Sequence, residues 1–421
     1  MGKHVVVVGA GVIGLSTAYY CAQRGWRVTL IDRSAQQRKS TSFANAGMIV
    51  PSHFVPLAAP GMVALALKWM WNPASPFYVK PRLSWDLVDW GLKFWHAATP
   101  QRVRRAAPLL RDLSQASRTC FRELAATWGN DFGLVQKGML LLFKTAQALD
   151  EEAHMAALAR SLDIAVEVLD PRQAAALEPG VRMDIEGAIY FPGDCHFTPD
   201  RFMARLEAEL IAAGVAFQWR TEATGWRIGR GGRIDAVKTG HGTDVEADEF
   251  ILCGGSWSPL MLRDLGLKLP MQAGKGYSLT LQNPRQLPQA CAILAEARVA
   301  VTPMAGALRF AGTMEIAGLN QDISPLRVRG IIDAAARYYP EFTPSDFAGV
   351  EPWQGLRPCS PDGMPYIGRT AKFTNLSLAT GHAMMGMSLG PITGKLMAQL
   401  LEGESPQIDL AQLSPDRYGG R

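Results

Sequence analysis

Hydrophobic and polar positions along the first 32 residues predict a β-α-β unit. Residues 4–8 are an apolar, β-branched run that ends at a glycine, which is typical of a strand buried on both faces of a parallel sheet. Residues 15–24 repeat their apolar positions at helical spacing, and residues 26–31 form a second short apolar run. This order predicts two neighbouring parallel strands that are joined by a helix.

Further periodic segments predict a mixed protein of helices and strands. We expect helices at residues 202–213 and 386–401, a strand at 215–219 and a hairpin at 228–236. With 421 residues the chain is long enough for two domains of ordinary size, so a cleft between two domains is expected.

A glycine-rich turn lies between the first predicted strand and its helix. Gly9 permits the tight turn, Gly11 lets the backbone approach a pyrophosphate, and Gly14 allows close packing of helix on strand. The free N–H groups at the start of the helix favour phosphates. Asp32 lies where a carboxylate accepts hydrogen bonds from ribose hydroxyls, and a carboxylate there disfavours a 2′-phosphate. The motif therefore predicts a site for FAD or NAD.

Residues 40–48 are mostly small or hydroxylic, which suits a loop that lies against a flat ligand. Together with the glycine turn, this loop resembles the flavin-contacting loop of the D-amino-acid oxidase superfamily, and it is most similar to that of the bacterial D-amino-acid dehydrogenases. The resemblance extends in family order through residues 55–61 with 68–70, 250–258, 274–278, 355–368, 380–382 and 386–391. Asp32 departs from the glutamate most common in the family, and residues 49–54 do not match the family pattern.

The resemblance implies an α/β fold and non-covalent FAD. A Rossmann-like FAD-binding domain of the glutathione-reductase-like type is expected from residues 1–55, 180–265 and 355–421. An α+β substrate domain with an antiparallel sheet is expected from residues 56–179 and 266–354. The expected cofactor contacts are Gly9, Ala10, Gly11, Val12, Ile13, Gly14, Asp32, Arg33, Ser40, Thr41, Ser42, Asn45, Ala46, Gly47, Met48, Ala223, Cys253, Gly254, Gly255, Trp257, Gly381, His382, Gly386, Met387, Ser388 and Leu389.

Amine oxidation by a flavin moves a hydride from the substrate α-carbon to flavin N5, so the protein mainly supplies position and electrostatics. We predict that Arg357 anchors the substrate carboxylate, because a guanidinium pairs with a carboxylate at two points. Tyr277 is the predicted second catalytic clamp, with a packed core tyrosine as the alternative. His53, Met48 and Met385 are the other predicted substrate contacts.

His382 and Cys359 each allow two interpretations. His382 is expected to contact the flavin through its backbone, with a catalytic side chain as the alternative. Cys359 is expected to be a small packed residue rather than a covalent flavin attachment.

Composition and charge narrow the partners. The net charge of +5 is not gathered into basic runs, so no nucleic acid partner is expected. The six cysteines lack metal or redox spacing and indicate reduced thiols in a cytoplasmic protein without a metal site. No signal-peptide pattern precedes the glycine turn, and residues 57–71, the longest apolar stretch, are too short and interrupted to span a bilayer.

Five of the eleven tryptophans are Trp69, Trp71, Trp85, Trp90 and Trp95. Such amphipathic rings suit a bilayer interface or a partner surface, although packing within a helical insertion is the favoured interpretation. A dehydrogenase of this kind needs an electron acceptor, and we expect a quinone or a redox partner, with possible peripheral contact at the inner face of the cell membrane.

Three functions remain open. The first is a D-amino-acid dehydrogenase, with D-proline or 4-hydroxy-D-proline favoured from the family resemblance. The second is a glycine or sarcosine type amine oxidase that reduces O₂. The third is a protein that binds a dinucleotide without turnover.

Overall fold

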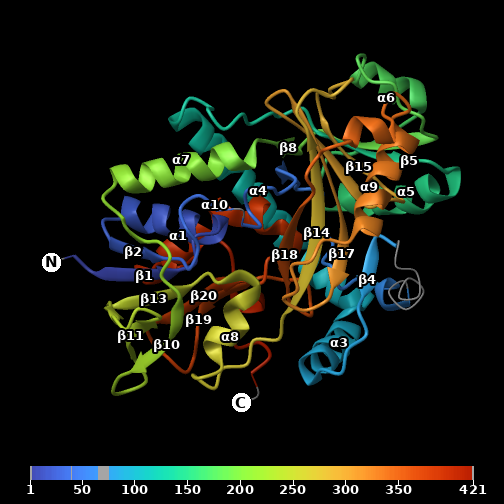
Figure 1. Ribbon diagram of the computed structural model, residues 1–421. Coiled ribbons are helices and arrows are strands. Elements are labelled where there is room, and N and C mark those ends of the chain that lie inside the picture. The colour runs from blue at the N-terminus through green and yellow to red at the C-terminus, as the bar shows by residue number, and fades with distance from the viewer. Residues whose placement is uncertain (1, 39, 65–74, 420–421) are drawn as a thin grey trace.

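The computed structural model describes residues 2–38, 40–64 and 75–419, in which two large sheets lie side by side (Figure 1). The smaller sheet has six strands. In spatial order they are β19 (Tyr366–Arg369), β20 (Leu376–Thr380), β13 (Glu249–Leu252), β1 (His4–Val8), β2 (Arg27–Ile31) and β9 (Ala216–Gln218). Neighbours run parallel except for β19, which pairs antiparallel with β20.

Both faces of the six-stranded sheet are covered, which explains why its central strands are apolar throughout. Val5 and Val7 of β1 belong to a core with the helices on one face, and Val6 and Val8 belong to a core with a small sheet on the other. The helices are α1 (Val12–Gln23), α7 (Pro199–Ala212) and α10 (Gly386–Leu401), and the small sheet is β10 (Ala223–Ile228), β11 (Ile234–Thr239) and β12 (Val245–Glu246).

The larger sheet has nine strands and is mostly antiparallel. In spatial order they are β18 (Trp353–Cys359), β14 (Gln272–Leu281), β17 (Ala307–Ile316), β16 (Val299–Met304), β15 (Cys291–Leu294), β5 (Met139–Phe143), β7 (Gly187–Phe191) and β6 (Glu167–Leu169), with β4 (Phe77–Val79) paired to β17. Helix α9 (Pro325–Tyr338) packs on one face through Ile331, Ala335 and Tyr338. The opposite face is therefore available to the site.

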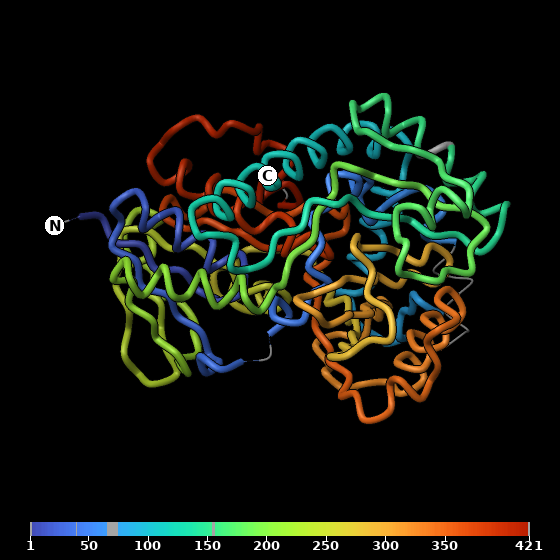
Figure 2. Tube along the Cα trace, turned by 90° about the horizontal axis from the view of Figure 1, so that it is seen from above, coloured from blue at the N-terminus to red at the C-terminus, as the bar shows by residue number. Residues whose placement is uncertain are grey.

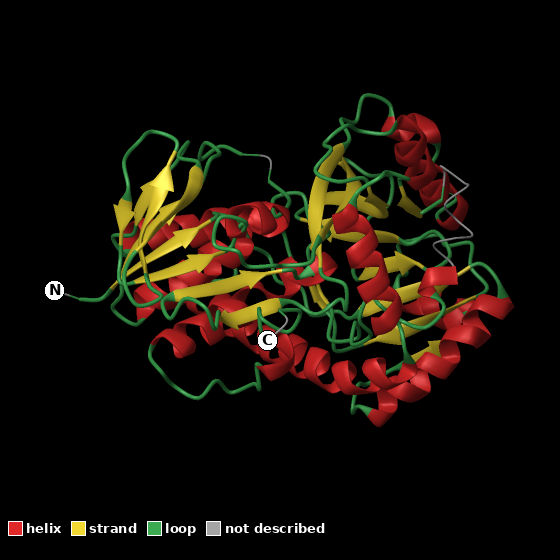
Figure 3. Ribbon diagram, turned by 90° about the horizontal axis from the view of Figure 1, so that it is seen from below, coloured by secondary structure: helices red, strands yellow, loops and turns green. Residues whose placement is uncertain are grey.

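The remaining helices lie around the larger sheet. They are α3 (Trp85–Ala97), α4 (Pro100–Thr127), α5 (Ala146–Ser161) and α6 (Pro171–Leu177), apart from the short α8 (Ser258–Leu262), which contacts β10. The long α4 follows one side of the molecule and packs on α10, so it connects the two halves (Figures 2 and 3). Two short strands, β3 (Met48–Ile49) and β8 (Cys195–His196), also pair between distant segments.

Most elements predicted from periodicity are present. The strand predicted at residues 4–8 is β1, the helix predicted at 386–401 is α10, and the hairpin predicted at 228–236 lies where β10 turns into β11. Helix α7 begins three residues before its predicted start, because Pro199 occupies the first helical turn, where a missing N–H costs no hydrogen bond.

Two strands lie across the expected domain boundaries. Residues 180–265 and 355–421 were expected in the FAD-binding domain, yet β7 and most of β18 pair within the nine-stranded sheet. We group both strands with the nine-stranded sheet, because a strand belongs to the sheet that satisfies its backbone hydrogen bonds. The division into two domains stays a proposal, with β7 and β18 assigned to the substrate side. Residues 68–70 of the expected insertion, with Trp69 and Trp71, lie outside the described residues.

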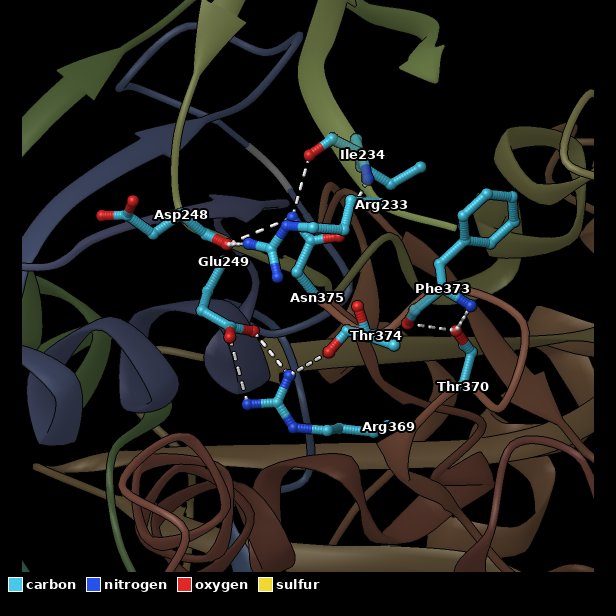
Figure 4. Close-up of polar contacts among 9 residues, drawn as sticks. All are labelled: Arg233, Ile234, Asp248, Glu249, Arg369, Thr370, Phe373, Thr374 and Asn375. Carbon is cyan, nitrogen blue, oxygen red and sulfur yellow. Dashed lines mark hydrogen bonds and ion pairs between the residues drawn. The ribbon is translucent and has the colours of Figure 1, made fainter. Parts of the chain in front are cut away.

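A buried asparagine fastens the small sheet to the six-stranded sheet (Figure 4). The Asn375 side chain accepts a hydrogen bond from the Ile234 N–H at 2.8 Å and donates to the carbonyl oxygens of Ile234 at 2.8 Å and Asp248 at 3.1 Å. Arg369 pairs with Glu249 through two contacts of 2.7 and 3.2 Å. These contacts fix the position of the hairpin and join the start of β13 to β19, the second strand away in the sheet.

Candidate active site

A cavity of about 710 Å³ lies between the two large sheets. One wall is formed where β1, β2 and β13 end at their carboxyl termini, which is where open α/β sheets bind ligands. The other wall is formed by β14, β17 and β18 of the larger sheet. The dinucleotide turn and Arg357 therefore lie in one cavity.

The glycine turn has the geometry that a dinucleotide needs. Gly9 has a φ of +110°, and a Cβ there would lie 2.5 Å from the Cys253 carbonyl oxygen. A Cβ on Gly14 would lie 1.8 Å from the Gly9 carbonyl oxygen, so only glycine fits beneath the turn. A Cβ on Gly11 would come no nearer than 3.6 Å to the protein, at Ser42. Gly11 is therefore free of packing demands, and its missing side chain leaves room for a ligand.

Asp32 and Arg33 define the nucleoside end of the cavity. The two carboxylate oxygens of Asp32 accept hydrogen bonds from the N–H groups of Ala10 and Ser34, both at 2.7 Å. Each oxygen keeps a further lone pair, which suits a ribose hydroxyl. The Arg33 guanidinium lies 4.2 Å from the ring centre of Trp257, so two predicted cofactor residues from distant segments form a cation–π contact.

The loop of residues 40–48 is held by the protein itself. Ser42 Oγ accepts a hydrogen bond from the Val12 N–H at 3.0 Å, and Asn45 Oδ1 accepts one from the Gly47 N–H at 2.9 Å. Thr41 Oγ1 donates to the Leu356 carbonyl oxygen at 3.4 Å, which links the loop to β18. By contrast, Ser40 Oγ lines the cavity and is buried without a hydrogen-bond partner among the described residues. That orphaned hydroxyl fits a polar cofactor.

Not all predicted cofactor residues reach the cavity. Five of them lie behind its wall and shape it from there: Ala10, Gly14, Gly47, Gly381 and Leu389. Gly47 and Gly381 have φ values of +69° and +78° and turn the backbone next to the site, and Leu389 is fully buried in the helix core. The other predicted cofactor residues line the cavity.

His382 precedes the short 3₁₀ turn Ala383–Met385 that leads into α10, and its ring is buried. Nε2 is 3.0 Å from Thr393 Oγ1, and burial lowers the pKa of His382 to about 3. The ring is therefore neutral at ordinary pH, and its Nε2 contacts Thr393 of α10. Both observations favour a flavin contact through the His382 backbone over a catalytic role of the side chain. Cys359 is fully buried beside Met314, and burial raises the pKa of its thiol to about 12.

Arg357 lies half-buried in the wall formed by the larger sheet. Its guanidinium crosses over Gly276, where a Cβ would lie 2.2 Å from Nη2. Nη1 donates to the Thr313 carbonyl oxygen at 2.6 Å, and Thr313 adopts a left-handed φ of +64°. Burial lowers the pKa of Arg357, yet a guanidinium stays protonated. No carboxylate among the described residues pairs with the Arg357 guanidinium. Its positive charge is therefore available to an anionic ligand in the cavity.

Tyr277 does not join Arg357. In the register of β14 with β18, Gly274 lies opposite Arg357 and Gln354 opposite Tyr277, so the arginine and tyrosine side chains project from opposite faces of the sheet. The tyrosine is 1% exposed in the core that contains α9. Its hydroxyl donates to Glu315 Oε2 at 2.8 Å, and burial raises its pKa. Tyr277 is among the residues that line the cavity, but its hydroxyl is engaged by Glu315 on the α9 side of the sheet, which favours the packed-tyrosine alternative; the clamp stays a prediction.

His53, Met48 and Met385 all line the cavity, and their role as substrate contacts stays a prediction. His53 is half-buried rather than on an open surface loop, and burial lowers its pKa to about 4, with Arg298 contributing in the same direction. Its ring is thus neutral at ordinary pH.

Three groups of the wall were not predicted. Thr313 presents its carbonyl oxygen to Arg357, Arg298 lies at the tight turn between β15 and β16 with a φ of +53°, and a floor of small side chains is made by Gly276, Ser278, Ala300 and Ala311. No local motif marks these residues, because alternate positions on three strands become neighbours only through sheet pairing.

A dinucleotide turn and a second, mostly antiparallel sheet share one cavity, which is the arrangement of a flavin-dependent oxidoreductase. The protein belongs to the DAO family of FAD dependent oxidoreductases, which it matches over residues 4–400. It is 32% identical to a D-amino acid dehydrogenase of Granulibacter bethesdensis, over 99% of this chain and 100% of the relative. It is 35% identical to a D-amino acid dehydrogenase of Methylobacterium nodulans, over 98% and 99%.

Solved structures show the same fold. Glycine oxidase from Geobacillus kaustophilus superposes with a TM-score of 0.78 at 24% identity, over 99% of this chain and 100% of that one. L-proline dehydrogenase from P. horikoshii gives 0.75 at 16% identity, over 99% and 98%. An L-alpha-glycerophosphate oxidase from Mycoplasma pneumoniae with FAD bound gives 0.72 at 16% identity, over 96% and 95%. The predicted family, fold class, FAD-dependent enzyme class and FAD cofactor are confirmed.

Proposed function

We propose that this protein is a FAD-dependent dehydrogenase of D-amino acids. The observation that carries the proposal is the guanidinium of Arg357, which faces the FAD cavity without a carboxylate partner among the described residues. Full-length relatives at 32% and 35% identity bear the name D-amino acid dehydrogenase, which supports this substrate class. FAD, when bound, supplies the acceptor for the hydride that leaves the substrate α-carbon.

The residues of the protein hold and orient the substrate. Arg357 binds the carboxylate, and the Thr313 carbonyl oxygen fixes one edge of the guanidinium so that its remaining N–H groups point to the ligand. The small side chains of Gly276, Ala300 and Ala311 leave a flat space for the reacting groups. Met48 and Met385 form an apolar wall that excludes water.

The cavity wall offers few proton acceptors. Among the described lining residues, the carboxylates are Asp32 and Glu222, which accompany the nucleotide turn rather than Arg357. His53 is the imidazole on the substrate side and is neutral above about pH 4. With a pKa of about 4, His53 is too weak a base to take the proton of a substrate ammonium, so the substrate amine enters in its neutral form and no strong base is needed.

Small or cyclic substrates such as D-proline or 4-hydroxy-D-proline form the finer part of the proposal. A screen of D- and L-amino acids with a soluble dye as electron acceptor tests both parts. Turnover of D-proline above that of acyclic D-amino acids is expected. Turnover of the L-enantiomers alone would contradict the proposed stereochemistry, and no turnover with any amino acid would contradict the function.

We further propose that the protein is cytoplasmic and that its reduced flavin passes electrons to a quinone or a redox partner. The fold neighbour glycine oxidase suggests O₂ as the competing acceptor. The flavin is reduced by substrate without oxygen and then mixed separately with air and with a soluble quinone analogue. We expect rapid reoxidation by the quinone and slow reoxidation in air. Rapid reoxidation in air alone would indicate an oxidase.

A further inference from the structure

Helix α3 has two apolar faces, of which only one is covered. Trp90 and Phe94 are buried, and Trp90 Nε1 donates to the Cys359 carbonyl oxygen at 2.9 Å. These side chains pack with Phe77 and Met314, which line the active-site cavity. The inner face of α3 is therefore part of the wall around the substrate site, and Figure 1 shows the helix at the periphery below the larger sheet.

The outer face of α3 is apolar and exposed. Trp85, Val88, Leu92 and Trp95 are 87%, 48%, 54% and 57% exposed. Their spacing of three, four and three residues places them along one side of the helix. Leu83, just before the helix, is also fully exposed. A continuous apolar stripe with two tryptophans is unusual on a free protein surface and marks an interaction site.

A cationic cluster lies next to this stripe. Residues 80–105 contain six lysines and arginines against two aspartates, so this short segment carries most of the net charge of +5. Both aspartates are already paired, Asp89 with Lys93 and Asp86 with Arg263. At the start of α4, two residues after α3, Arg102, Arg104 and Arg105 are exposed and form no ion pair with the described residues.

We infer that the α3 stripe and the three arginines of α4 form a docking surface for an anionic lipid bilayer. Tryptophan rings prefer the boundary between hydrocarbon and headgroups, and arginines beside them pair with lipid phosphates. A second copy of this protein is a poorer occupant, because a symmetric contact through this face would bring two sets of unpaired arginines together. Within the described residues no helix is long and apolar enough to cross a membrane.

Docking here would hold the substrate cavity beside the bilayer. The inner side chains of α3 touch residues of the cavity wall, so the membrane would lie one helix away from the site. This link to a lipid-soluble quinone rests on the proposed function. The contact with lipid does not depend on the proposed function.

Vesicle flotation of the full-length, FAD-loaded protein tests the surface. Vesicles of phosphatidylcholine alone are compared with vesicles that also contain phosphatidylglycerol. The variants are Trp85→Ser/Trp95→Ser and Arg104→Glu/Arg105→Glu. The matched controls are Ile211→Ser, an equally exposed apolar residue on α7, and Arg172→Glu/Arg230→Glu, which change the same charge elsewhere. Flavin absorbance and far-ultraviolet circular dichroism verify that each variant is folded.

Wild type and controls are expected to float with the anionic vesicles, and both α3–α4 variants are expected to bind them about tenfold more weakly. Binding that is equal in all variants, or equal on both kinds of vesicle, would overturn the inference. So would a stable dimer in light scattering that Trp85→Ser/Trp95→Ser dissociates. Turnover with a soluble dye stays unchanged in all variants, so loss of dye turnover would count against the proposed function, not the lipid contact.

Discussion

At the scale of single residues, the site depends on how one cation is held. Arg357 lies over Gly276, and Thr313, in a left-handed conformation, turns its carbonyl oxygen toward Nη1. One N–H group is fixed by Thr313, and the others form no hydrogen bond with the part of the chain that the structure describes, so they can bind a carboxylate. Because the guanidinium is already oriented, binding a carboxylate costs little further ordering.

Replacement of the anchor tests this view. Arg357→Ala is expected to lower kcat/KM about 100-fold, mainly through KM, because truncation of one partner of a hydrogen-bonded charge pair costs roughly 2–5 kcal/mol. FAD should stay bound, since Arg357 lies on the substrate wall. Arg357→Lys keeps the positive charge but loses the two-point pairing with a carboxylate. Its kcat/KM should therefore lie between those of the wild type and Arg357→Ala. Steady-state kinetics and flavin absorbance give both readouts, and an unchanged KM in Arg357→Ala would place the anchor elsewhere.

Tyr277 provides the opposite test. Tyr277→Phe removes a hydroxyl that donates to Glu315, on the face of the sheet that α9 covers. We expect kcat/KM to change by less than about twofold and the free energy of unfolding to fall by about 1.5–3 kcal/mol, the contribution of a hydrogen bond to a charged group. Urea unfolding and kinetics measure the two effects. A rise in KM as large as that of Arg357→Ala would show that the tyrosine reaches the substrate.

At the scale of elements, pairing between strands decides what each residue can do. The β-α-β unit, the closing helix α10 and the hairpin of β10 and β11 follow from periodicity, because a strand or helix needs only its own local pattern. Which face Tyr277 occupies depends on the register of β14 with β18. A shift of one residue would reverse every side chain, and local sequence does not set that register.

The hairpin also depends on one side chain. Asn375→Ala would leave the Ile234 N–H and the carbonyl oxygens of Ile234 and Asp248 without their partner (Figure 4). We expect about 2–4 kcal/mol lower stability, since each buried unsatisfied group costs about 1–3 kcal/mol. Asn283→Ala, at an exposed position, is the control. Thermal unfolding measures the loss, and an unchanged melting temperature would contradict the role.

At the scale of the whole molecule, one cavity is enclosed by segments from both ends of the sequence. The turn at residues 9–14, the strand that carries Arg357 and the start of α10 all contribute to its wall. Burial in this wall also changes the titration of histidines. The pKa of His382 is lowered to about 3, whereas in the unfolded state it returns toward 6.5.

The sign of the resulting pH effect follows from proton uptake. Between about pH 3 and 6.5 the unfolded state protonates His382 and the folded state leaves it neutral, so this histidine lowers stability as the pH falls through that window. Between pH 7 and pH 5 the loss is about 2 kcal/mol. His382→Asn should therefore show a smaller decrease in unfolding free energy over that range than the wild type. Urea unfolding at both pH values checks this, and parallel decreases would contradict it.

The sequence by itself determined the dinucleotide unit and the residue type of the anchor. Gly9, Gly11, Gly14 and Asp32 belong to one β-α-β unit, whose regular geometry brings Asp32 back beside the glycine turn, so the sequence of this segment is enough to predict the site. Only the tertiary structure decided the substrate side. Arg357 is matched to Thr313 through two steps of strand pairing, and that contact is formed by backbone, which carries no residue signature. Likewise, helical periodicity shows that α3 has two apolar faces, but only packing decides which of them remains exposed.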